Sequence, residues 1–180
     1  MRIAWDKQDE KLVENSVSDM LKVFGFDTTD PGFIDTPSRV MRFYRDFTQQ
    51  APPEIKVFPS CSTDMIQLNN FKTWGLCPHH LLPVKYDITI RYMPNGKVFG
   101  ISKLPRVANY ILRTMPLQED LPKLIVDYLF ELLDVQYAMS LVDGEHLCMI
   151  MRGVKADGCS LTTMYERWAE PEKENTCQVN

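Results

Sequence analysis

Residues 74–92 read WGLCPHHLLPVKYDITIRY and carry both a structural and a chemical signal. Over 84–92, apolar and aromatic side chains alternate with polar ones, which is the period of a strand with one buried face. Directly ahead of that strand stand Cys77, His79 and His80. The stretch therefore predicts a strand that begins beside a cluster of metal-ligating side chains.

A metal site is the main chemical prediction. Cys77 and His80 can turn toward one ion when the backbone between them bends, and Pro78 favours such a bend. The third histidine, His146, precedes Cys148 by two positions, so the two share one face if the segment is a strand. Cys77, His80 and Cys148 are thus predicted to hold zinc, with a water or substrate atom as fourth ligand. A closed structural site that uses His146 as the fourth ligand is the alternative.

The composition bounds the class of protein. With 180 residues, 44% of them hydrophobic, the chain is long enough for one domain with a real core and a small appendage. Its net charge of −4 gives no general attraction to nucleic acid or to an anionic membrane. Neither is expected as a partner, and any anion binding must be local.

The cysteines and the first residues indicate a cytoplasmic protein. The five cysteines show no tight disulfide spacing, and the start of the chain lacks the apolar core of a signal peptide. No segment approaches the roughly 20 apolar residues of a membrane-spanning helix. A reducing compartment is therefore expected.

Two amphipathic helices are predicted upstream of the central stretch. Apolar residues recur at helical steps over 9–24, and a second helix begins at Pro37 with Asp35 or Thr36 as its cap. A proline-rich segment then leads to the main body, so residues 1–52 form an N-terminal helical appendage. A solvated face is the main alternative to a binding role for the arginines that recur on the second helix: Arg39, Arg42 and Arg45.

The rest of the chain predicts an α+β body at 53–164 and a polar, loosely ordered tail at 165–180. A turn at 94–96 is expected to join two strands in a hairpin, and Asp143 with Gly144 is expected to turn the last pair of strands. The expected elements are strands at 65–71, 81–93 and 97–102, helices at 102–115 and 120–133, and two strands between 135 and 154.

Four motifs follow one another along the chain: CPHHLLP at 77–83, GISKLPR at 100–106, LQED at 117–120 and HLCMIMRGV at 146–154. In this order and at these separations they resemble GTP cyclohydrolase I, a family of the tunnelling-fold superfamily. A segment of the second helix, DTPSRV at 35–40, is similar to the N-terminal helical motif of that family, and the likeness covers roughly residues 10–164. The resemblance implies a four-stranded antiparallel sheet with two helices on one face, preceded by an N-terminal helical pair.

The resemblance also implies roles around the metal. It makes Cys77, His80 and Cys148 the zinc ligands and makes His79 and His146 proton carriers. A zinc ion activates water for attack on C8 of guanine, and a histidine can deliver a proton to the departing ring nitrogen. The implied product is 7,8-dihydroneopterin triphosphate, with C8 released as formate.

Phosphate binding is expected at the start of the 102–115 helix. Free N–H groups and the helix dipole favour an anion there, and the resemblance assigns Lys103, Arg106 and Arg152 to the triphosphate of GTP, with Ser102 beside them. Without the resemblance, Lys103 and Arg106 would be read as ordinary surface charges.

Guanine recognition is implied for the Gln118–Glu119 pair, because one carboxylate can accept hydrogen bonds from both N1 and N2. The alternative is that Glu119 and Asp120 only favour a helix start. The chain departs from the family at Pro78, usually Glu, at Asp120, usually Arg, and in CSLTTM at 159–164, which leaves the register of the final strand open.

Assembly and competing functions complete the expectations. Exposed sheet edges invite pairing, and the resemblance implies a homo-oligomer, two stacked rings of five with active sites between subunits. One competing function is a superfamily relative that acts on another purine or pterin, such as the nitrile reductase of deazaguanine metabolism. The other is a non-catalytic protein that binds a nucleotide and holds structural zinc.

Overall fold

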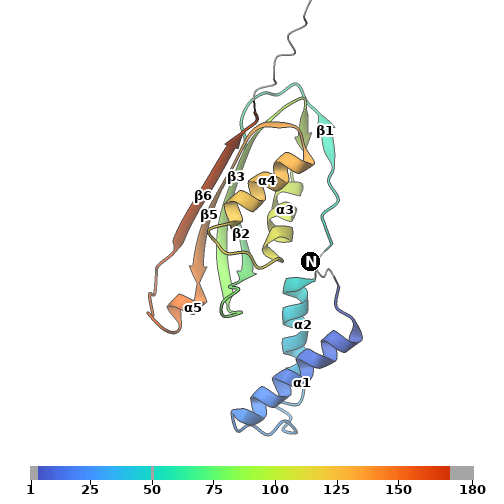
Figure 1. Ribbon diagram of the computed structural model, residues 1–180, viewed down its shortest axis with the longest axis vertical. Helices are drawn as coiled ribbons and strands as arrows, with labels where there is room; N and C mark the ends of the chain where they lie inside the picture. Colours follow the sequence, from blue (N-terminus) through green and yellow to red (C-terminus); the bar gives the residue numbers. More distant parts are fainter. Residues whose placement is uncertain (1–3, 50, 171–180) are drawn as a thin grey trace, which may run out of the picture.

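A computed structural model describes residues 4–49 and 51–170 and shows a mixed α+β architecture (Figure 1). A four-stranded antiparallel sheet has the order β2-β3-β5-β6, and a two-stranded sheet joins β1 and β4. The helices α3 and α4 cover one face of the larger sheet, while α1 and α2 lie beyond one of its ends. The strands are β1 Val57–Pro59, β2 Ile66–Leu76, β3 Pro83–Pro94, β4 Lys97–Phe99, β5 Val135–His146 and β6 Leu161–Trp168, and the helices are α1 Lys7–Val23, α2 Thr36–Thr48, α3 Lys103–Leu112, α4 Leu121–Leu132 and α5 Leu147–Ile150.

The centre of the sheet follows from the alternation in β3. Val84, Ile88 and Ile90 are fully buried and point toward the helices, whereas Lys85, Asp87 and Thr89 alternate with them and are polar. Because β3 pairs with β2 on one side and with β5 on the other, its backbone hydrogen bonds are used on both edges. The predicted central strand is confirmed.

The helix pair α3 and α4 supplies the other half of the core. Val107 and Ala108 of α3 and Ile125, Val126 and Leu129 of α4 have no exposed surface. Burying one Val, Ile or Leu side chain stabilises the fold by about 1.5–3 kcal/mol relative to leaving it exposed. The four-stranded sheet with two helices on one face is therefore as expected.

The N-terminal helices also form as expected. Asp6 caps α1 by accepting hydrogen bonds from the amides of Gln8 and Asp9, at 2.8 and 2.9 Å. The Arg45 guanidinium lies 2.7 Å from the Glu10 carboxylate and links α2 to α1. One member of the arginine row thus holds the two helices together.

The predicted hairpin between β3 and β4 is wrong. Both edges of β3 are already occupied, so β4 pairs with β1, a short strand in the segment that was read as a connection. The Tyr92 hydroxyl accepts a hydrogen bond from the Phe99 amide at 3.1 Å and ties this small sheet to β3.

The predicted turn at Asp143 and Gly144 is also wrong, because β5 runs straight through both residues and pairs Gly144 with Tyr86. Glycine stands there because a Cβ atom would lie 3.0 Å from the Tyr86 ring and closer still to the Gln118 amide. The glycine that suggested a turn therefore marks a position where other side chains approach the strand closely.

The last strand, β6, begins later than expected and includes residues 165–168, which were assigned to the tail. Its side chains are mostly exposed, so the apolar alternation that reveals a strand is weak, and backbone pairing with β5 holds it. Residues 171–180 of the expected tail lie outside the described residues. Among the helices that the structure describes, none combines the length and apolar character that a membrane crossing requires.

Candidate metal centre and active site

The loop between β2 and β3 is folded tightly on itself. The Cys77 amide donates to the Leu82 carbonyl at 2.9 Å, and the Cys77 carbonyl accepts from the amides of His80 and Leu81, at 3.3 and 2.8 Å. Leu81 takes a positive φ of 54°, which closes the turn. These bonds hold Cys77 and His80 at the same end of the sheet.

The structure places Cys77 next to each of the other two predicted zinc ligands. Cys77 Sγ lies 3.7 Å from His80 Nδ1 and 3.8 Å from Cys148 Sγ, although Cys148 is 71 positions along the chain. The thiols are well protected, with Cys77 3% and Cys148 9% exposed. Cys148 belongs to the short helix α5, which follows directly on β5.

His146 also joins this cluster. One ligand atom from each of Cys77, His146 and Cys148 lies within 4.8 Å of the others, a spacing that could hold a metal ion. His146 ends β5 and Cys148 lies in α5, so the two do not share a strand face as expected. His146 therefore stands beside both thiols, and His80 stands beside Cys77.

Hydrogen bonds distinguish the two imidazoles. His146 Nε2 lies 2.6 Å from Gln118 Oε1, and an amide oxygen only accepts, so this nitrogen carries the hydrogen. His80 Nε2 lies 2.7 Å from Arg152 Nη1, and a guanidinium only donates, so this nitrogen accepts. His146 is left with a free lone pair on Nδ1, whereas the hydrogen of neutral His80 sits on Nδ1.

Burial governs the protonation of the cluster. It lowers the pKa of His146, an effect that the Glu119 carboxylate opposes. Burial, reinforced by the adjoining Cys77 thiol, raises the pKa of Cys148, and burial likewise raises the pKa of Tyr86 beside the two thiols. Burial thus favours the neutral forms of His146, Cys148 and Tyr86, and a cation bound to the sulfurs would favour thiolates.

Gln118 and Glu119 lie at the same end but differ in exposure. The Gln118 side chain is 3% exposed, and its amide nitrogen donates to the carbonyls of Val142, at 3.4 Å, and Leu161. With His146 on its oxygen, every polar atom of this side chain has a protein partner. Glu119 is exposed, and its charge acts on His146.

The residues expected at the triphosphate are split between the two ends of the sheet. Arg152 reaches His80, but Ser102, Lys103 and Arg106 stand at the start of α3. Leu104, in that first turn, lines a hollow with Tyr92, which is eight positions along β3 from Val84, or roughly 26 Å. Figure 1 shows that the start of α3 lies away from α5. One chain does not bring this group to the thiols.

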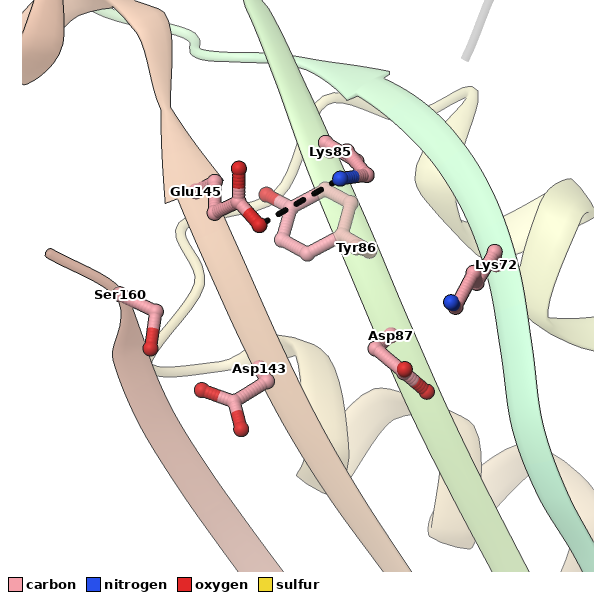
Figure 2. A pocket seen from close by; sticks show the side chains of 7 residues that line it. All are labelled: Lys72, Lys85, Tyr86, Asp87, Asp143, Glu145 and Ser160. Atoms are coloured by element: carbon pink, nitrogen blue, oxygen red, sulfur yellow. Dashed lines mark hydrogen bonds and ion pairs between the residues drawn. The ribbon is translucent and has the colours of Figure 1, made fainter. Parts of the chain in front are cut away.

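The face of the sheet opposite the helices carries charged residues that sequence reasoning did not single out (Figure 2). Lys85 Nζ lies 3.4 Å from the Glu145 carboxylate, and Thr162 donates to Asp143 at 2.8 Å. Their positions alternate with the buried residues of β3 and β5, so the period-two pattern could have located them. Asp143 lies opposite Thr162 in the sheet, which fixes the register of β6.

Most of the chain is similar to known proteins. Residues 13–178 match the family model for GTP cyclohydrolase I. The chain is 35% identical over 160 residues to "GTP cyclohydrolase 1" of Campylobacter curvus (strain 525.92), covering 86% of this chain and 84% of that protein. It is 36% identical over 163 residues to "GTP cyclohydrolase 1" of Clostridium perfringens (strain 13 / Type A), covering 87% and 88%.

Among solved structures, the apo form of the archaeosine synthase QueF-Like aligns with 59% of this chain and 96% of its own, with a TM-score of 0.45 and 14% identity. At that level the likeness adds nothing to the assignment. The family model and the two relatives extend over most of the chain, as the motifs predicted. The chain therefore belongs to the GTP cyclohydrolase I family.

Proposed function

We propose that this protein converts GTP and water to 7,8-dihydroneopterin triphosphate and formate. The observation that carries the proposal is the buried group of Cys77, Cys148 and His146, with His80 beside it, in a chain of the GTP cyclohydrolase I family. The product would enter folate, reduced pterin or deazaguanine synthesis, and we place the reaction in the cytoplasm.

The donor set fits zinc. Two thiols and an imidazole are ligands that Zn²⁺ prefers. Two sulfurs bound tetrahedrally at about 2.3 Å stand about 3.8 Å apart, and the Cys77 and Cys148 sulfurs are separated by 3.8 Å. Cys77 and Cys148 would hold the ion with one imidazole. Our proposal keeps His80 as that ligand and His146 as a proton carrier. His80 would bind the ion through Nδ1, beside Cys77, and would give up the hydrogen on that nitrogen when the ion binds.

The bound zinc and the histidines His146 and His79 have different roles in the proposed reaction. When bound, zinc supplies the acidity that lets a water act as a nucleophile near neutral pH. His146, with a free lone pair on Nδ1, takes a proton from the attacking water and returns it to the ring nitrogen as the bond to C8 breaks. His79, exposed on the Cys77 loop, is proposed as the second proton carrier.

Substrate recognition is proposed for both ends of the sheet. Glu119 accepts from N1 and N2 of guanine, since the Gln118 side chain is engaged inside the protein. The triphosphate contacts Arg152 and the start of α3, namely Ser102, Lys103 and Arg106. Because that start lies away from Cys77, the complete site needs α3 from a neighbouring copy. We propose a homo-oligomer of two stacked rings of five.

One experiment tests the activity. The purified protein is analysed for zinc and incubated with GTP, and formate and the fluorescent pterin are measured. We expect about one zinc per chain and equal amounts of formate and pterin. Zinc without formate would instead indicate a nucleotide-binding protein, and absence of zinc with nicotinamide-dependent nitrile reduction would indicate the reductase.

A further inference from the structure

We propose that Gln118 is a positioning residue that fixes the tautomer and ring orientation of His146, and that Gly144 is glycine to make room for it. The geometric part is independent of the reaction. The expected effect on turnover rests on the proposed function, because it requires His146 to move a proton during GTP hydrolysis.

The orientation of the Gln118 amide is determined by its neighbours. Its nitrogen faces the carbonyl oxygens of Val142 in β5 and Leu161 in β6, and both oxygens can only accept hydrogen bonds. A flipped amide would place oxygen against oxygen at two buried points. The oxygen must therefore face His146 Nε2, which lies 2.6 Å away.

This contact selects one form of the imidazole. An oxygen acceptor at Nε2 keeps the hydrogen on that nitrogen and leaves the lone pair on Nδ1. The Tyr86 ring meets the His146 ring edge to face, with centroids 6.3 Å apart, and limits its rotation. His146 is thus held in one tautomer and in one plane before any ligand arrives.

Gly144 explains how a loop side chain reaches this position. Gln118 comes from the segment between α3 and α4, and its amide lies against the backbone of β5. A Cβ atom at residue 144 would overlap the Gln118 amide and stand 3.0 Å from Tyr86 Cε1. Glycine within a strand weakens it, so the position is accounted for by the space that the amide requires.

The loop is anchored independently of His146. Thr163 in β6 donates its hydroxyl to the Gln118 backbone carbonyl at 3.2 Å. Replacing the side chain therefore leaves a bond that holds the loop. The two parts of the amide can also be separated, since only the oxygen serves His146 and only the nitrogen serves the two carbonyls.

The test compares three variants of the full chain with the wild type. Gln118→Met keeps the length of the side chain and removes the acceptor, whereas Gln118→Glu keeps an acceptor. Gln136→Met alters an exposed glutamine of β5 and serves as the matched control. Two-dimensional ¹⁵N–¹H spectra of the histidine rings report the tautomer, and the chain has only His79, His80 and His146 to assign.

We expect the wild type and Gln118→Glu to show His146 with hydrogen on Nε2, and Gln118→Met to show a mixture of tautomers. The kcat of Gln118→Met should fall about 10- to 100-fold with the KM for GTP within about twofold. Gln118→Glu should regain only part of the rate, because it restores the acceptor for His146 but turns its second oxygen toward the carbonyls of Val142 and Leu161. Gly144→Ala should shift the same resonances by displacing the amide.

Several results would overturn the proposal. A wild-type His146 with hydrogen on Nδ1 refutes it without any variant, and so does an unchanged tautomer in Gln118→Met. A variant with raised KM and unchanged kcat would make Gln118 a guanine-binding residue instead. If the wild type releases no formate, the proposed function fails, and the spectra still decide the positioning role.

Discussion

The two ends of the main sheet are built in different ways. At the end that carries Cys77 and Cys148, the thiols are buried and every polar atom of Gln118 has a protein partner. At the start of α3, Arg106 and Ser102 are exposed, and the side chain of Ile101 is 90% exposed. At the first end, one chain supplies the buried and hydrogen-bonded groups, whereas at the second, open end the side chains are exposed to solvent.

Electrostatics accounts for this difference. Neutral thiols and a neutral imidazole can be buried in advance at small free-energy cost, because the thiols need to ionise only when a metal binds. Lysine and arginine have to stay in water until an anion pairs with them, since an isolated buried cation is strongly destabilising. Under the proposed function, the chemical half is preformed, and the phosphate half would be completed by ligand and by a neighbouring copy.

The largest expected effect is at the preformed end. Cys148→Ala should reduce zinc from about one per chain to near zero and bring GTP hydrolysis to background, because one sulfur ligand is lost. Metal analysis and formate release measure both quantities. Cys159→Ala, which changes an exposed thiol, is the control and should retain both. Full zinc and full rate in Cys148→Ala would show that the cluster is not the metal site.

The next effect separates the two imidazoles. His146→Ala should keep zinc and lose about 10²- to 10⁴-fold in kcat, the range for a lost proton carrier, whereas His80→Ala should lose zinc. The same metal and formate assays apply. Zinc lost from His146→Ala and kept in His80→Ala would reverse the assignment, which the close grouping of His146 with both thiols allows.

A smaller effect is expected at the open end. Arg106→Ala should raise the KM for GTP about 10- to 100-fold, the loss of one hydrogen-bonded charge pair, without changing zinc content. Arg39→Ala, an exposed arginine of α2, should leave the KM unchanged.

Mixing subunits tests whether the two halves come from different copies. Oligomers reassembled from equal amounts of Arg106→Ala and Cys148→Ala chains should regain about a quarter of the wild-type rate at low GTP, since each site takes one half from each of two chains. No recovery after verified subunit exchange would place the whole site within one chain.

The smallest effect is on the charged face of the sheet, opposite the helices. Lys85→Ala removes the exposed pair with Glu145 and should lower the free energy of unfolding by less than about 1 kcal/mol. Ile88→Ala, three positions along the same strand, should lower it by about 2–5 kcal/mol because it opens the core. Urea unfolding measures both, and equal losses would contradict this account of the sheet.

Periodic signals were the part of the fold that the sequence predicted well. The alternation in β3 and the helical spacing in α3 and α4 reflect burial on one face, so each is readable locally. The proximity of Cys77 and Cys148 was predicted from ligand chemistry. The element that carries Cys148 was predicted wrongly, because it is the helix α5 and not a strand. The choice between His80 and His146 depends on their contacts with Arg152 and Gln118, which no spacing reveals.

Pairing partners and close approaches could not be predicted in the same way. β4 pairs with β1 because β3 has no free edge, which is a property of the whole sheet. In the sequence, Gly144 looks like a turn residue. The group that excludes a side chain there is the amide of Gln118, which lies 26 positions earlier and leaves no local signal. The strand at residues 165–168 has little apolar surface and depends on its neighbour β5.

The separation of the two sulfur ligands along the chain has a thermodynamic consequence. An ion shared by Cys77 and Cys148 would tie together positions 71 residues apart and enclose β3, α3, α4 and β5, which hold most of the core. By the chain-entropy argument, a cross-link over a loop of that length disfavours the unfolded ensemble by about 4 kcal/mol. Removing the ion with a chelator would then lower the melting temperature of the protein as well as its turnover. The ion would have a structural role in addition to its catalytic one.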